Sequence, residues 1–304
     1  MSDPLVWLPF DPALLDPPPT GLRYEVVDPT EHVPDSVAEV EVYVPPYQMK
    51  PAVADVLPRM TSLRLVQTLS AGVDNVRARI PDGVTLCNGR GIHDASTAEL
   101  ALTLTLASLR GIPGFVRAQE RREWTFGWYP ALADRRVLLV GYGAIGEAIE
   151  RRLAPFEVEV VRVARTAREG VHTIDELPAL LPDADVVVLV VPLTEATRGL
   201  VDAEFLARMK EGALLVNVAR GAVVVTDDLV AALHSGRISA ATDVTEVEPL
   251  PADHALWSAP NLLVSPHVGG SSSAMWPRAY RLVREQLTRY AAGEPLANVM
   301  AGDY

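Results

Sequence analysis

Residues 137–153 read VLLVGYGAIGEAIERRL, and this stretch decides the fold. An apolar run that predicts a buried strand is followed by three glycines in the pattern G-x-G-x-x-G and then by a helix pattern. In such a turn the first glycine permits the sharp bend, the second lets a pyrophosphate approach the backbone, and the third lets helix and strand pack closely. The N–H groups at the start of the helix attract phosphate. The alternative is a glycine-rich turn in an α/β domain without a ligand. The residues expected to contact a dinucleotide here are Gly141, Gly143, Ala144, Ile145 and Gly146.

The surrounding sequence repeats the strand–turn–helix alternation. Continuous Val/Leu runs separated by helix patterns are typical of a doubly wound parallel sheet. Strands are expected at 137–141, 158–163, 185–191, 213–218, 240–244 and 262–266, and helices at about 144–154, 175–181, 203–209 and 226–234. Shorter apolar runs at 5–10, 40–44, 63–69 and 84–87 predict a second parallel sheet before it, and 271–295 predicts a final amphipathic helix.

Residues 96–110 form a helix pattern that is apolar on nearly every face. A helix of this kind is buried on all sides, for example between two domains or two subunits, or lies in an ordinary core. The sequence does not separate these alternatives.

Composition excludes several classes of protein. The chain has 304 residues, of which 49% are hydrophobic, and a formal net charge of −12, which argues against a nucleic-acid or anionic-membrane surface. Cys87 is the single cysteine, so no internal disulfide forms, and its apolar neighbours indicate a small buried hydrophobe. We see no signal peptide, no apolar run long enough to span a membrane and no metal-ligand spacing, so a soluble, cytoplasmic protein is expected.

The stretch VVRVARTAR, residues 160–168, bears on the cofactor. An acidic residue that binds the adenosine ribose is expected about 20 residues after the glycine turn, and Ala164 stands there instead. Without this carboxylate a 2′-phosphate is not repelled, and Arg165, Thr166 and Arg168 can bind it. The pattern favours NADP(H), while NAD(H) stays possible if both arginines are solvated surface charges.

Three further segments lie at or just after the carboxyl ends of predicted strands and contain residues suited to catalysis. VNVARG contains Arg220, DVTEVEP contains Asp243 and Glu248, and SPHVGG contains His267. Open α/β sheets bind ligands at the carboxyl ends of their strands. There an arginine can bind the carboxylate of a 2-keto acid, a histidine can protonate its carbonyl oxygen as hydride arrives, and a glutamate can orient the histidine and raise its pKa.

These motifs, together with SAGVDN, NGRGIHDASTAE and VPLTEATRGLVD, resemble the D-isomer-specific 2-hydroxyacid dehydrogenase family. The turn ARTAR is similar to that of the NADPH-linked glyoxylate/hydroxypyruvate reductases. The resemblance implies an α/β fold of two Rossmann-like, doubly wound parallel-sheet domains. A nucleotide domain, 96–267, is inserted into a discontinuous substrate domain, 1–95 and 268–304, with the active site in the cleft. It also implies a homodimer packed through the nucleotide domain.

The resemblance assigns roles to individual residues. Arg220 matches the substrate-binding arginine, Glu248 the histidine's partner and His267 the acid/base. Further substrate-binding candidates are the backbone of Ala71 and Gly72, with Tyr47 a weaker pocket candidate. Cofactor-lining candidates are Thr97, Pro192, Ala219, Asp243, His267 and Gly269.

Other features leave alternatives open. His254 and His93 are expected to be structural, or for His93 at most to support the substrate segment. Trp124 and Trp128 are either a dimer arm or anchors of a connecting loop. An NAD(H)-sensing binding protein of the corepressor type, without significant turnover, is the alternative to an enzyme. Formate or phosphite oxidation on the same scaffold is a third reading.

Overall fold

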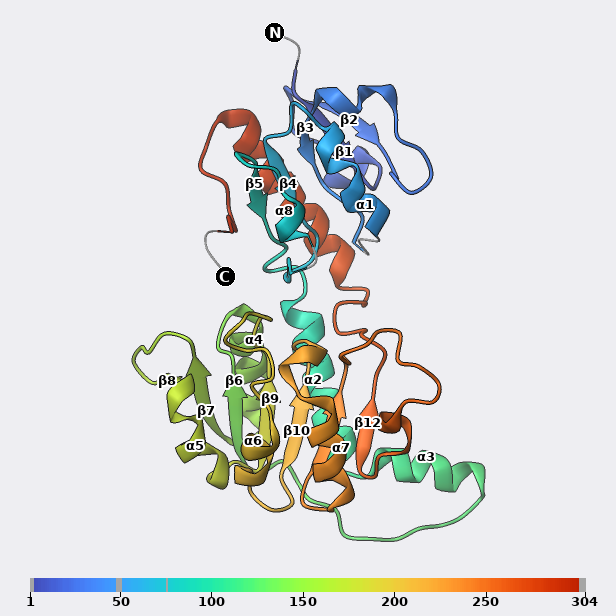
Figure 1. Cartoon of the computed structure of the whole chain (residues 1–304), viewed down its shortest axis with the longest axis vertical. Helices are drawn as coiled ribbons and strands as arrows, with labels where there is room; N and C mark the ends of the chain where they lie inside the picture. The colour runs from blue at the N-terminus through green and yellow to red at the C-terminus, as the bar shows by residue number, and fades with distance from the viewer. Residues whose placement is uncertain (1–2, 48–50, 75, 301–304) are drawn as a thin grey trace. The chain divides into compact units, whose positions relative to one another are not determined.

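The computed structural model describes residues 3–47, 51–74 and 76–300. The chain divides into two compact units, one made of residues 1–93 and 273–304, the other of residues 94–272 (Figure 1). The second change of unit falls at residue 272, whereas the sequence placed it at 267. The difference arises because the segment after His267 is tied to the second unit: the N–H of Gly269 donates to Asp243 (2.7 Å), and the hydroxyls of Ser272 and Ser96 share a hydrogen bond (2.6 Å).

The first unit contains a five-stranded parallel sheet in the order β2-β1-β3-β4-β5. The strands are β1 (Leu5–Leu8), β2 (Arg23–Val26), β3 (Val40–Tyr43), β4 (Leu65–Gln67) and β5 (Thr85–Cys87). Alternate side chains enter two separate cores. Helix α8 (Met275–Ala292) packs its Ala279, Val283 and Leu287 into one of them and ends at Gly293, whose φ of +68° suits glycine.

Strand β2 was not predicted. It lies at the edge of the sheet, and its sequence RYEV has no buried residue, so it lacks the apolar run that marked the other strands. The connections of this unit are mostly short 3₁₀ turns. They are η1 (Pro12–Leu15), η2 (Asp35–Glu39), η3 (Leu57–Arg59) and η4 (Arg77–Arg79), with a five-residue helix α1 (Pro51–Asp55).

The C-terminal segment completes this first unit. Gln286 of α8 donates to the side chain of Gln67 (2.8 Å), and both are buried. The backbone N–H of Met300 donates to Leu86 (2.9 Å). Cys87 is buried in β5, as predicted, and burial raises the pKa of its thiol to about 11.

The second unit contains a seven-stranded parallel sheet in the order β12-β11-β10-β9-β6-β7-β8. The strands are β6 (Arg136–Val140), β7 (Glu159–Ala164), β8 (His172–Thr173), β9 (Val186–Leu189), β10 (Leu214–Asn217), β11 (Ser239–Thr242) and β12 (Leu262–Val264). The order reverses between β6 and β9, as in a doubly wound sheet. The predicted fold class, two parallel-sheet α/β domains, is confirmed.

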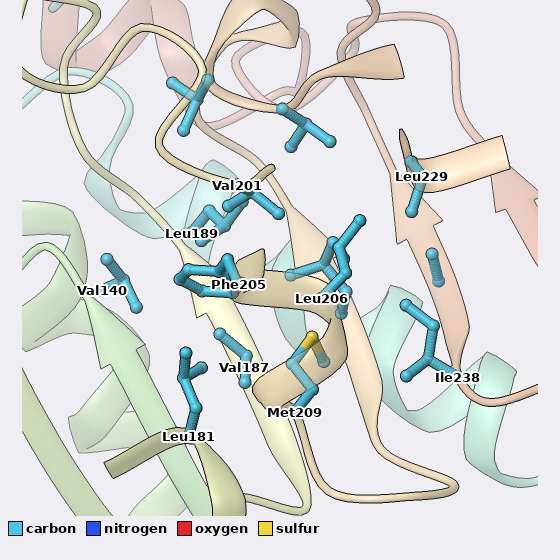
Figure 2. Packing of buried hydrophobic residues seen from close by; sticks show 14 of the residues in the cluster. Val140, Leu181, Val187, Leu189, Val201, Phe205, Leu206, Met209, Leu229 and Ile238 are labelled. Carbon is cyan, nitrogen blue, oxygen red and sulfur yellow. The ribbon is translucent and has the colours of Figure 1, made fainter. Parts of the chain in front are cut away.

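Helices cover both faces of this sheet. Leu138 and Val140 of β6 enter the core beneath α5 (Leu177–Leu180), α6 (Ala203–Arg208) and α7 (Thr226–His234), where Phe205 of α6 lies beside Val187 and Leu189 of β9 (Figure 2). Val137 and Leu139 enter the opposite core, beneath α2 (Asp94–Leu109) and α4 (Ala144–Leu153). Short 3₁₀ turns flank these helices: η5 (Ala154–Phe156), η6 (Ile174–Glu176), η7 (Leu181–Asp183), η8 (Gly221–Val223) and η9 (Ala255–Ser258).

Helix α2 is not covered on every side by its own unit. Ala98, Ala101 and Leu104 are buried, while Leu106 is half-buried and Thr103 is exposed. Helix α3 (Ile112–Glu120), which the sequence did not predict, follows it. In the part of the chain that the structure describes, no helix has the length and apolar character needed to cross a membrane.

Candidate active site

The glycine turn is tightly packed at its first and third glycines. Gly141 has a φ of +107°, and a Cβ there would lie 2.6 Å from the carbonyl oxygen of Val190. A Cβ on Gly146 would lie 2.5 Å from the carbonyl oxygen of Gly141. Both glycines are therefore required by the protein itself. Gly143 differs, because a Cβ there would meet no atom within 4 Å. Its lack of a side chain leaves open space above the turn, which fits the close approach of a dinucleotide pyrophosphate.

Helix α4 begins directly after this turn, with Gly143 as its N-cap and no side-chain hydrogen bond to its first N–H groups. The N-terminus of α4 therefore offers N–H donors to an anionic ligand. The loop after β9 lies next to the turn, because β6 and β9 are neighbours and Gly141 packs on Val190. In that loop the carbonyl of Pro192 accepts a hydrogen bond from the Thr197 hydroxyl (2.6 Å).

A basic turn follows β7. Ala164 is the last residue of this strand, and Arg165, Thr166 and Arg168 after it are exposed. The N–H of Val171 donates to the carbonyl of Arg168 (2.9 Å), which closes a short hairpin. The Arg168 side chain turns back to the glycine turn, where its Nη2 donates to the carbonyl oxygen of Tyr142 (2.6 Å). This edge thus carries positive charge beside the predicted cofactor turn.

His267 and Glu248 form a pair at the same edge of the sheet. The Nδ1 of His267 lies 2.6 Å from Oε2 of Glu248, and the other carboxylate oxygen accepts from the N–H of Thr245 (3.0 Å). Gly221 brings the loop of Thr245 close, since a Cβ on Gly221 would lie 1.9 Å from the carbonyl carbon of Thr245. His267 has a left-handed φ of +53°, and its N–H donates to the carbonyl of Asp243 (2.7 Å).

The pair shifts the pKa values of both groups. The hydrogen bond to Glu248 raises the pKa of His267 above its ordinary value, against the opposing effects of burial and of the Arg220 charge. Burial acts to raise the pKa of Glu248, but the hydrogen bonds from His267 and Thr245 lower it overall. A histidine protonated to a higher pH than usual, with an ionised partner, is suited to proton transfer near neutrality.

Asp243 is buried at the end of β11, with 3% of its surface exposed. Its carboxylate accepts hydrogen bonds from the Ser265 hydroxyl (2.5 Å) and from the N–H groups of Val268 (2.9 Å) and Gly269 (2.7 Å). The carbonyl of Gly269 in turn accepts from the Thr97 hydroxyl (3.3 Å). Asp243 therefore fixes the loop that carries His267.

Arg220 follows β10, the neighbour of β11. Its Nη1 donates to the carbonyl of Ala219 (2.8 Å), and the Asn217 side chain holds this bend by donating to the carbonyl of Arg220 (3.1 Å) and accepting from the N–H of Ala219 (3.0 Å). The Arg220 charge acts on the pKa values of both Glu248 and His267, so the three groups interact. Asn217, Ser265 and Tyr142 were not predicted. A polar residue ending an apolar strand was the signal for Asn217.

Ala71, Gly72 and Tyr47 belong to the other unit, where the ring of Tyr47 lies 5.1 Å from that of His93. His254 caps η9 by accepting from the N–H of Leu256 (3.2 Å), which is a structural role. Within residues 3–47, 51–74 and 76–300, no cluster of three or more His, Cys, Asp or Glu side chains suits a metal ion.

On an open α/β sheet, a carboxylate-paired histidine and an arginine beside a dinucleotide turn can combine hydride transfer with proton transfer at a carbonyl, which defines a nicotinamide-dependent oxidoreductase. Comparison with known proteins narrows this class. The sequence profile described as "D-isomer specific 2-hydroxyacid dehydrogenase, NAD binding domain" matches residues 102–269. The chain belongs to the D-isomer-specific 2-hydroxyacid dehydrogenase family and is an NAD(P)-dependent enzyme of that family.

Individual relatives agree with this assignment. Human glyoxylate reductase/hydroxypyruvate reductase is 34% identical over 255 residues, which are 77% of this chain and 76% of the human protein. A D-isomer specific 2-hydroxyacid dehydrogenase from Xanthobacter autotrophicus Py2, solved with NADPH, has a TM-score of 0.83 and 34% identity, and the match covers 99% of this chain and 98% of the other. An NADPH-dependent glyoxylate/hydroxypyruvate reductase from Sinorhizobium meliloti, solved with NADP and malonate, has a TM-score of 0.80 and 29% identity, covering 99% and 97%.

Proposed function

We propose that this enzyme reduces small 2-keto acids, glyoxylate and hydroxypyruvate among them, with NADPH as the preferred cofactor. The observation that carries the reaction is the His267–Glu248 pair at 2.6 Å, within electrostatic reach of Arg220 at the carboxyl ends of adjacent strands. The substrate class is supported by the relatives whose names specify glyoxylate and hydroxypyruvate.

A nicotinamide cofactor, when bound, would supply the hydride. Arg220 binds the substrate carboxylate through its guanidinium fork and polarises the adjacent carbonyl. His267 gives a proton to the carbonyl oxygen in reduction and takes it back in oxidation. Glu248 fixes the proton of the imidazole on Nδ1, so that Nε2 faces the reaction. Asp243 would hold the nicotinamide carboxamide, and it also holds the loop of His267.

The other expected roles are part of this proposal. The open space above Gly143 and the N–H groups of α4, at Ala144 and Ile145, receive the pyrophosphate. Thr97, Pro192, Ala219 and Gly269 line the cofactor. In the first unit, the backbone N–H groups of Ala71 and Gly72 bind the substrate carboxylate, and Tyr47 contributes to the side-chain pocket.

Cofactor preference provides the first test. The variant Arg165→Ala removes a charge-assisted hydrogen bond to the 2′-phosphate. We therefore expect kcat/KM with NADPH to fall about 10-fold or more. NADH has no such phosphate, so its kcat/KM is expected to change less than twofold. The measurement is the reduction of a panel of 2-keto acids by NADPH and by NADH in parallel.

Arg208→Ala is the matched control. Arg208 is an exposed arginine at the end of α6, next to the amino end of β10, and pairs with Glu204. The variant Arg208→Ala removes the same charge at the opposite edge of the sheet. We expect no change in kcat/KM with either cofactor. Equal use of NADPH and NADH by the unmodified enzyme would contradict the cofactor proposal and make these arginines surface charges.

The pH dependence follows from the pair. Because the pKa of His267 is raised, the imidazole stays protonated to a higher pH than a free histidine. Reduction, which needs this proton, is expected to be constant below that pKa and to fall about tenfold per pH unit above it, whereas oxidation, which needs the neutral imidazole, is expected to rise about tenfold per pH unit below that pKa and to be constant above it. Glu248→Gln removes the charge that raises the pKa of His267. The fall in the rate of reduction and the rise in the rate of oxidation, the two limbs of the pH profile, therefore both move to lower pH. Limbs that stay in place in this variant would contradict the role of Glu248.

We also propose a homodimer formed through the second unit. The segment after α3 exposes Trp124 (98%), Phe126 (83%) and Trp128 (94%), and α2 leaves Leu106 half-buried. Large exposed aromatic side chains close together are typical of protein interfaces. This supports the reading of the segment as a dimer arm, and the molar mass in solution tests it. The sensor reading is not favoured, since the named relatives are reductases; binding of cofactor without turnover of any 2-keto acid would restore it.

A further inference from the structure

Tyr142, between the first two glycines of the turn, belongs to a cluster of charged side chains. Its hydroxyl donates a hydrogen bond to the carboxylate of Glu150 on α4. Arg162 of β7 donates to the same carboxylate, with its Nε 3.0 Å from Oε2 and its Nη2 close to Oε1. Glu150 therefore anchors both the tyrosine and the arginine.

Arg168 closes over this cluster from the basic turn. Its guanidinium carbon lies 5.3 Å from the centroid of the Tyr142 ring, within the range of a cation–π contact, and its Nη2 donates to the carbonyl oxygen of the same residue. The guanidinium carbon of Arg162 lies 5.7 Å from that ring. One aromatic side chain thus contacts both arginines.

The charges of the cluster are balanced in a way that favours a nearby phosphate. An unpaired carboxylate on α4 would repel a 2′-phosphate, but the hydrogen bonds from Arg162 pair the charge of Glu150 and lower its pKa. The charges of Arg165 and Arg168 are then left to attract an anion at the end of β7. The bond to Tyr142 uses Nη2 of Arg168, and a guanidinium has further N–H donors for a ligand.

The contact also reduces the entropy cost of binding. An exposed arginine side chain samples many rotamers, and each immobilised side chain of this kind costs free energy when a ligand binds. Arg168 is already held, at its backbone by the hairpin with Val171 and at its guanidinium by Tyr142. A tyrosine that served only as packing for α4 would not need this contact.

We propose that Tyr142, held by Glu150 and Arg162, positions Arg168 for the 2′-phosphate of NADP(H) and so helps to determine cofactor specificity. Tyr142 is a positioning residue, acting through Arg168 rather than on the reacting atoms. The inference rests on the NADPH preference proposed above.

The test compares binding rather than turnover. Dissociation constants of NADPH, NADH and adenosine 2′,5′-bisphosphate are measured for the unmodified enzyme, Tyr142→Leu, Tyr142→Phe, Arg168→Ala and the double variant Tyr142→Leu/Arg168→Ala. Loss of the ring in Tyr142→Leu is expected to weaken the two 2′-phosphorylated ligands about 2- to 5-fold and to leave NADH unchanged. Tyr142→Phe keeps the ring but loses the hydrogen bond to Glu150, so it should restore part of this loss. In the absence of Arg168, removing the ring should add no further loss.

The outcomes separate this inference from the cofactor proposal. If the unmodified enzyme binds NADPH no better than NADH, both are overturned. If it prefers NADPH and Arg168→Ala loses that preference while Tyr142→Leu keeps it, only the role of Tyr142 is overturned. Equal weakening of NADH and NADPH in Tyr142→Leu also overturns it, because that result indicates a general structural role of the ring in the turn.

Discussion

Replacing His267 with alanine is expected to lower kcat roughly 10²–10⁴-fold in both directions, which is the usual contribution of a positioned general acid or base. The imidazole is the group placed and tuned for proton transfer, since Glu248 lies 2.6 Å from its Nδ1. Binding of the cofactor depends on other residues and should change little. Steady-state turnover of glyoxylate, together with the dissociation constant of NADPH, measures the two effects separately.

Two further variants make this result unambiguous. His267 has a φ of +53°, which alanine adopts with strain but asparagine tolerates, so His267→Asn removes the imidazole without straining the loop that binds Asp243. His234→Ala is the control, because this exposed histidine bonds to the carbonyl of Val230 in its own helix at the far end of α7. Turnover that persists in His267→Asn would show that another group transfers the proton.

Replacing Arg220 with alanine is the second large effect. We expect kcat/KM for a 2-keto acid to fall roughly 10²–10³-fold, the loss that follows removal of one donor to a developing oxyanion. Arg220→Lys keeps a positive charge but loses the planar fork, so it should recover only a small part of the rate. Arg220→Ala should also lower the affinity for a non-reacting dicarboxylate such as malonate.

Steady-state kinetics and inhibitor binding with these variants distinguish a role of Arg220 in substrate binding from a role in catalysis. A rise in KM with unchanged kcat would assign Arg220 to substrate binding alone, whereas a fall in kcat shows that it also polarises the carbonyl. Activity of Arg220→Ala equal to that of the unmodified enzyme, or of the Arg208→Ala control, would contradict its role.

The sequence predicted the central strands of both sheets because their Val/Leu runs are buried on both faces, as in β6, β9 and β10. It did not predict β2 or the two-residue strand β8, which lie at sheet edges and carry no such run. Helix α3 was missed as well. The predicted helix at 175–181 proved to be the single turn α5 between two 3₁₀ turns, where Pro178 and Pro182 limit regular helix.

For the site too, the sequence predicted some features and not others. His267, Glu248 and Asp243 could be chosen from the sequence because each lies at or just after the carboxyl end of a predicted parallel strand, and such strands end at one edge. The distance between His267 and Glu248, the hydrogen bonds from Val268 and Gly269 to Asp243 and the packing of Gly221 on Thr245 depend on tertiary structure. Tyr142 was missed for that reason: its partners Glu150, Arg162 and Arg168 lie on three different elements.

The divided first unit has a consequence for synthesis on the ribosome. Residues 94–272 are contiguous, so the second unit can fold as soon as that length of chain has emerged. The first strands cannot complete their packing until α8 has been synthesised, because α8 covers the apolar face that includes Val6, Leu8 and Leu65. The hydrogen bond between Gln67 and Gln286 also requires that helix. We therefore expect the first ninety residues to be the last to reach their native state and, during translation, to be the part of the nascent chain most exposed to chaperones.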